Sequence, residues 1–110
     1  MGKDTLGEFE LMVLLAVMRL GEEEAYALAI VDDISARTGR GVRRSAVHMT
    51  LQRLEKKGHL STWLGEPRPE RGGKARRHVR IAPQGAQAVH ESRSALESMW
   101  GDLDTTVESA

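Results

Sequence analysis

Apolar residues along this chain recur at helical spacing in four stretches and alternate in two short ones. Nearly every residue from 9 to 20 is apolar, which predicts a helix that its own domain or a partner subunit covers on all sides. Thr5 and Glu8 have the spacing of a capping box at its start. A second helix is predicted over 26–38, with Gly39 as its terminator. Its apolar positions are Leu28, Val31 and Ile34.

A third helix is predicted over residues 46–57. Ser45 is a suitable N-cap and Gly58 a suitable left-handed stop, and Val42, just upstream, is expected to pair briefly with a strand. The apolar stripe of this helix consists of Val47, Leu51 and Leu54. On a helical wheel the opposite face carries Ser45, Met49, Gln52, Arg53 and Lys56, with His48 at its margin.

Residues 60–64 and 76–81 alternate like two antiparallel strands, and the segment 65–75 between them is long for a hairpin loop. Val79 and Ile81 are predicted to point inward. The residues predicted to point outward are Arg76, His78 and Arg80.

Pro83 opens a last helix, which is predicted to run to residue 107. Apolar positions step along it by three and four in a heptad seam that suits packing across a dimer. The seam consists of Ala86, Val89, Arg93, Leu96, Trp100, Leu103 and Val107. The whole pattern predicts a mainly α fold with a small β-hairpin wing. It comprises a winged helix-turn-helix DNA-binding domain over 5–81 and a C-terminal dimerisation helix over 83–107.

Composition restricts the class of protein further. A chain of 110 residues with 40% hydrophobic content suits one globular domain. The sequence has no cysteine, which excludes disulfides and thiolate chemistry and suits a cytoplasmic protein. It shows no signal peptide, and its longest uncharged apolar run (11–18) is too short to span a membrane.

Positive charge is concentrated in one part of the chain. Residues 40–80 contain twelve Lys or Arg and three acidic residues, a local net charge of +9 in a chain whose total is zero. Such a segment is suited to meet a polyanion with one face. The winged helix-turn-helix therefore predicts binding to double-stranded DNA, with the third helix in the major groove and the wing on phosphates.

Individual DNA contacts follow from this geometry. Gln can bond adenine in two places, and Met can touch a thymine methyl. The base-edge candidates are Ser45, His48, Met49 and Gln52. The phosphate candidates are Arg43, Arg44, Arg53 and Lys56 on or before the helix, and Arg71, Gly72, Gly73, Lys74, Arg76 and Arg77 on or beside the wing loop.

Three other functions remain open. The basic wing could dock an acidic protein partner. An RNA-binding protein would need more stacking aromatics than the 4% present. An enzyme is the least favoured, because no residue set has nucleophile, base and stabiliser roles. The histidines lack metal-ligand spacing, so neither a metal nor a cofactor is expected and surface or interface positions are expected for them.

The first and last helices both carry apolar surface that needs a cover. A symmetric homodimer would provide it and would place two third helices about one DNA turn apart, which matches a palindromic operator. A ring on the seam could also line a cavity for a flat small-molecule effector. The residues assigned to the dimer contact or the effector cavity are Phe9, Met12, Leu96, Trp100 and Leu103.

Several motifs in order along the chain follow one known pattern. They are LGEFEL (6–11), EAY (24–26), AV (46–47), LQRLEKKG (51–58), GEP (65–67), ERGGKA (70–75) and APQG (82–85). Over about residues 5 to 104 the sequence resembles the PadR family of bacterial winged-helix transcriptional regulators. The resemblance implies a homodimer held by the first and last helices, promoter binding with repression, and release by a small molecule or another signal.

The sequence departs from that family at a few positions. The family often has Tyr where His48 stands, Gly where Ala27 stands, and an aromatic pair where His78 and Val79 stand. Some drug-sensing relatives carry a tryptophan in the last helix at the dimer pore. Here Leu96 holds that place and Trp100 lies one turn later.

Overall fold

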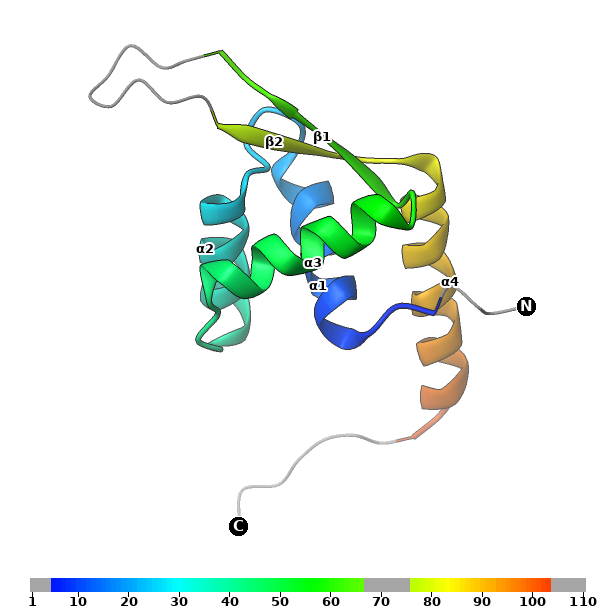
Figure 1. Cartoon of the computed structure of the whole chain (residues 1–110). Coiled ribbons are helices and arrows are strands. Elements are labelled where there is room, and N and C mark those ends of the chain that lie inside the picture. The colour runs from blue at the N-terminus through cyan, green and yellow to red at the C-terminus, as the bar shows by residue number, and fades with distance from the viewer. Residues whose placement is uncertain (1–4, 67–75, 104–110) are drawn as a thin grey trace.

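Four helices and one hairpin make up the fold in the computed structural model, which describes residues 5–66 and 76–103 (Figure 1). In chain order the elements are α1 (Glu8–Leu20), α2 (Ala27–Thr38), α3 (Arg44–Lys56), β1 (Leu60–Leu64), β2 (Arg77–Ile81) and α4 (Pro83–Trp100). The helix α3 crosses one face of the molecule, the hairpin runs along one edge, and α4 packs against α1 on the side away from α2 (Figure 1). This order and packing confirm the predicted mainly α winged-helix architecture.

One hydrophobic core joins α1, α2, α3 and the hairpin. Its fully buried large side chains include Val13, Leu14, Ile30, Val47, Leu54 and Val79. The predicted stripe of α3 is buried as expected, and Thr50 is buried beside it. The stripe predicted for α2 is partly wrong. Leu28 is 45% exposed, and Ile30 is buried in the core together with Ile34.

The hairpin pairs β1 with β2 in antiparallel register, with Leu60 opposite Ile81 and Leu64 opposite Arg77. A third segment joins this sheet on the other edge of β2. Tyr26 forms a bridge with His78, and the Val79 N–H donates a hydrogen bond to the Ala25 carbonyl at 2.8 Å. The segment that joins the sheet is therefore the turn before α2. The strand pairing expected for Val42 is wrong, because that residue lies outside every strand.

Two helices begin at other residues than predicted. The N-cap of α1 is Gly7, whose N–H donates to the Glu10 carboxylate at 2.9 Å, so Thr5 and Glu8 do not form the capping box. The N-cap of α3 is Arg43, with extended backbone, and Ser45 lies inside the first turn. The C-terminal signals were more accurate, since Gly39 and Gly58 both have the positive φ of left-handed stops.

The last helix is shorter than predicted. It begins at Pro83, as expected, but ends at Trp100, and Leu103 lies beyond it in irregular backbone. Val107 lies outside the described residues. The N-terminal part of α4 is buried against the rest of the domain through Ala88 and Val89, while its C-terminal part is exposed. Within the described residues, no helix has both the length and the hydropathy that a membrane crossing needs.

Candidate nucleic-acid interface

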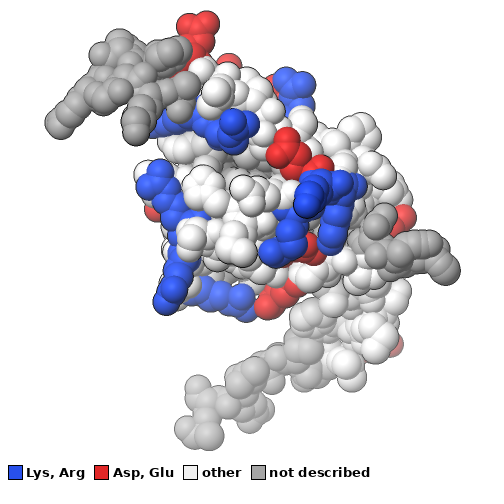
Figure 2. Space-filling view, in the orientation of Figure 1, with Lys and Arg blue, Asp and Glu red and all other residues white. Residues whose placement is uncertain are grey.

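The outward face of α3 is the centre of the candidate site. Ser45, His48, Met49 and Gln52 are all exposed there, because the buried stripe occupies the opposite side of the helix. Met49 is 59% exposed, so its side chain adds an accessible apolar group to this face. Lys and Arg side chains surround this uncharged patch on the molecular surface (Figure 2). The arrangement places groups that can read bases between groups that can hold phosphates.

Cations flank α3 at both ends. Arg43 and Arg44 precede and open the helix, and Lys56 closes it. Within residues 5–66 and 76–103, none of these three side chains forms an ion pair with a carboxylate. Their charges are therefore available to an external anion. Arg43 and Lys56 stand at opposite ends of a helix thirteen residues long. Such a helix spans roughly 20 Å, more than the major-groove width of about 12 Å, so its ends can reach the flanking phosphates.

Arg53 and Lys57 are held differently, by a carboxylate from another helix. Glu10 of α1 lies 3.2 Å from the Lys57 Nζ and 3.6 Å from the Arg53 Nε. Burial alone would raise the pKa of Glu10, but the Gly7 N–H and the two cations outweigh it, so the pKa lies below its ordinary value. Arg53 also donates to the Thr50 hydroxyl at 3.3 Å. The C-terminal end of α3 is thereby tied to the start of α1.

The base of the wing is connected to α3 through a chain of hydrogen bonds. Arg77 Nη1 donates to the Thr62 hydroxyl at 3.0 Å, and that hydroxyl donates to the Glu55 carboxylate at 3.2 Å. A hollow of about 200 Å³ lies between the helix and the hairpin, lined in part by His48, Gln52 and Arg77. These contacts fix the spacing between α3 and the first residues of the wing.

Aromatic rings cover the other face of the hairpin. Trp63 stacks on His78 with ring centroids 5.4 Å apart, and His78 meets Tyr26 edge-on at 6.1 Å. His78, which was predicted to point outward, is therefore half-buried between these rings. Its Nδ1 is buried and has no hydrogen-bond partner within residues 5–66 and 76–103. No local sequence pattern marks this cluster, although Trp63 and His78 fall opposite each other once the strands are paired.

The remaining predicted site residues are divided between described and undescribed parts. Arg77 is the first residue of β2 and Arg76 directly precedes it, so both follow the hairpin loop. The wing-loop residues Arg71, Gly72, Gly73 and Lys74 lie outside the described residues. Among the histidines, His48 and His90 are exposed as expected. His59 is not, since it is 1% exposed beneath the start of α4.

A second, apolar surface lies between α1 and α4, away from α3. It is a groove of about 740 Å³, whose lining includes Leu11, Leu15, Met18, Val89, Leu96 and Trp100. Leu96 is 50% exposed and Trp100 52% exposed, so the groove lacks a cover within the described chain. Phe9 and Met12 are half-buried against the domain core and do not line it. Leu103 is exposed beyond the end of α4.

Taken together, the three helices, the two-stranded wing and the long final helix define a winged-helix protein. No protein-family model and no curated protein sequence matches the chain. Solved structures do match. A PadR family transcription regulator from Clostridium difficile R20291 is 12% identical, with a TM-score of 0.71 over 84% of this chain and 91% of its own. A PadR family transcriptional regulator from Eggerthella lenta is 23% identical, with a TM-score of 0.63 over 84% of this chain and 79% of its own.

A third match is BpsR of Bordetella bronchiseptica, a protein whose DNA binding is regulated by 6-hydroxynicotinic acid. It is 17% identical and has a TM-score of 0.62 over 96% of this chain and 73% of its own. The chain therefore has the fold of the PadR-type regulators, in agreement with the resemblance in its sequence motifs.

Proposed function

We propose that this protein is a transcriptional regulator that binds double-stranded DNA in a sequence-specific manner, and that it acts as a repressor. The observation that carries the proposal is the uncharged, exposed face of α3, with cations at its ends that form no ion pair within the described residues. A B-DNA major groove about 12 Å wide accepts such a helix, and its edges are lined with phosphates. The fold shared with PadR-type regulators adds to this support.

We propose further that two copies of the chain bind one palindromic operator. The groove between α1 and α4 is open and apolar, and Leu96 and Trp100 in its wall are half-exposed. Burying large apolar side chains across a symmetric interface would stabilise a dimer by roughly 1.5–3 kcal/mol for each side chain. The same surface lies away from α3, so pairing through it leaves both DNA-reading helices free.

The groove also supports control by a small molecule. Its wall combines the Trp100 ring with His90 and the ion pair of Arg93 with Glu97, a set that suits a flat aromatic compound with polar substituents. That the DNA binding of BpsR, which shares this fold, is regulated by 6-hydroxynicotinic acid is consistent with an effector of this class. An effector seated between two subunits would change their relative placement and hence the spacing of the two α3 helices.

The test is selection of bound fragments from random or genomic duplex DNA, followed by affinity measurement on the selected duplex at several salt concentrations. Each phosphate contact contributes about −0.9 to the slope of log affinity against log salt, so a dimer with several contacts gives a steep slope. Selection should recover two inverted half-sites about one helical turn apart. Failure to enrich any sequence, with no binding to any duplex at low salt, would overturn the proposal.

A charge-matched pair of variants makes the result specific to α3. Arg44→Gln should weaken DNA binding and lower the salt slope by about one for each subunit. Arg19→Gln removes the same charge from α1, where Arg19 is paired with Asp33 outside the groove, and should leave the slope unaltered. Preference for single-stranded RNA over the selected duplex, or binding of an acidic protein with no DNA affinity, would instead support the two alternative functions.

A further inference from the structure

Two arginines of the hairpin lie against aromatic rings. Arg80 belongs to β2, and Arg76 directly precedes that strand. The Arg76 Cζ lies 4.0 Å from the centroid of the Tyr26 ring, and the Arg80 Cζ lies 5.1 Å from that of Trp63. The two arginines differ in their ion pairing. Arg80 is paired with Glu22 at 3.1 Å, whereas Arg76 has no carboxylate partner within the described residues.

Tyr26 is a well-fixed platform for this contact. Its backbone forms the bridge to His78, and its carbonyl accepts the first hydrogen bond of α2 from the Ile30 N–H at 2.9 Å. Its ring also meets the edge of the His78 ring. The position of the ring is thus set by the sheet and by α2 together, at the place where the wing leaves the domain.

Stacking on a ring leaves a guanidinium able to bind phosphate. The ring occupies one flat face of the group, while the N–H donors project in its plane and remain free. An arginine on a mobile side chain must lose rotamer freedom when it binds a phosphate. An arginine already held flat on a ring has lost part of that freedom beforehand, so more of the binding energy appears as affinity.

We infer, on the basis of the proposed DNA binding, that Tyr26 is a positioning residue which holds Arg76 flat and presents its edge to a DNA phosphate at the base of the wing. Tyr26 itself need not touch DNA for this role. The ring face is what matters, and the hydroxyl is not required.

A double-mutant cycle on the selected duplex tests the inference. Tyr26→Phe keeps the ring and should bind within about twofold of the parent protein. Tyr26→Leu should weaken binding by about two- to fivefold for each bound subunit, the range of an exposed cation–π contact. In the Arg76→Ala background, Tyr26→Leu should have no further effect on DNA affinity, because the arginine that it positions is gone.

Two further variants separate loss of the arginine–phosphate contact from loss of the folded structure. Arg76→Lys keeps the charge but loses the flat group, and it should weaken binding without altering the thermal unfolding midpoint. Arg80→Ala is the matched control, since Arg80 is neutralised by Glu22, and it should change affinity less than Arg76→Ala. If Tyr26→Leu weakened DNA binding equally in the parent protein and in the Arg76→Ala background, the inference would be overturned and the proposed function would stand. A parent protein that binds no duplex would overturn the proposed function as well.

Discussion

The carbonyl oxygen of His59 lies so close to the α-carbon of Gly85 that no side chain fits between them. A Cβ placed on Gly85 would overlap that oxygen and lie 3.0 Å from a side-chain carbon of Ile81. The same carbonyl accepts a hydrogen bond from the Ala82 N–H at 3.0 Å, at the start of α4. This contact joins the last helix to the segment between α3 and β1, and it explains why a glycine stands in the first turn of α4.

Replacing Gly85 with Ala should therefore destabilise the protein by roughly 1–3 kcal/mol, the usual cost of overpacking a tight site. The loss is expected although alanine favours helices more than glycine does. Urea unfolding gives the measurement. Gly41→Ala is the control, because Gly41 has open space around it and no positive φ, and it should be neutral or slightly stabilising. Equal stability of the two variants would contradict the packing argument.

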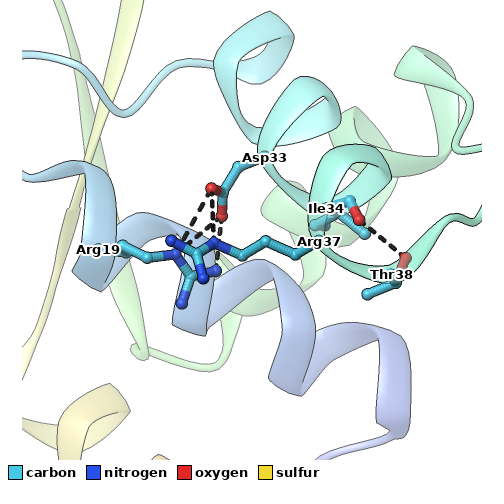
Figure 3. A network of polar contacts seen from close by, with 5 residues as sticks. All are labelled: Arg19, Asp33, Ile34, Arg37 and Thr38. Carbon is cyan, nitrogen blue, oxygen red and sulfur yellow. Dashed lines mark hydrogen bonds and ion pairs between the residues drawn. The ribbon is translucent and has the colours of Figure 1, made fainter.

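A second link joins α1 to α2 through Asp33 (Figure 3). Arg19 of α1 donates to its carboxylate at 2.6 Å, and Arg37, one turn along α2, donates at 3.2 Å. The hydrogen bond from Arg19 lowers the pKa of Asp33, burial opposes it, and Arg37 lowers it further, so the pKa lies below its ordinary value.

The pH dependence follows from that direction. A carboxyl whose pKa is lower in the folded than in the unfolded state stabilises the fold above the unfolded-state pKa, and this contribution is lost as pH falls through the folded-state pKa. Asp33→Asn should cost roughly 0.5–1 kcal/mol at neutral pH, a value typical of partly exposed pairs. The difference in stability from the parent protein should begin to shrink as pH falls toward 3.8, the ordinary pKa of Asp, and should vanish only below the lowered folded-state pKa. Asp32→Asn, at an exposed neighbour, should show neither effect.

Short-range sequence patterns predicted most of the fold. The spacing of Val47, Leu51 and Leu54 fixed which face of α3 is buried, and this in turn fixed the exposed face that carries Met49 and Gln52. Both strands were placed to within a residue, because alternation and the glycine stops bounded them.

What the sequence could not supply was contact between distant segments. The ion pair of Glu10 with Lys57 spans 47 positions, and no local pattern marks either residue. The burial of His59 depends on where α4 crosses the chain, and the pairing of Tyr26 with β2 involves a turn that does not alternate. The starts of α1 and α3 were missed for a related reason. Several polar residues precede each helix, and packing of the helix decides which of them becomes the N-cap.

The groove between α1 and α4 gives a prediction about association. Trp100→Glu would place a charge where each subunit is proposed to bury a ring, so it should raise the dimer dissociation constant by on the order of 100-fold. Light scattering coupled to size-exclusion chromatography, over a range of protein concentrations, would show the shift toward monomer. Ser94→Glu adds the same charge to α4 outside the groove and should leave the molar mass measured in solution, and hence the oligomeric state, unaltered. A parent protein that is monomeric throughout would contradict dimerisation through this surface.

Two residues in the C-terminal half of α3, Gln52 and Lys56, should affect DNA binding in different ways. Gln52 is exposed on the uncharged patch, where its amide can make two hydrogen bonds to an adenine edge. Gln52→Ala should therefore cost roughly 1–3 kcal/mol on the selected operator and little on other duplexes, so discrimination at one base pair is lost. Lys56→Ala removes a phosphate contact and should weaken binding to all sequences alike, with a shallower salt slope. Binding to the operator and to single-base variants of it, at two salt concentrations, separates the two effects. If both substitutions lowered affinity for every duplex equally, α3 would hold the DNA backbone only, and sequence would have to be read by another part of the protein.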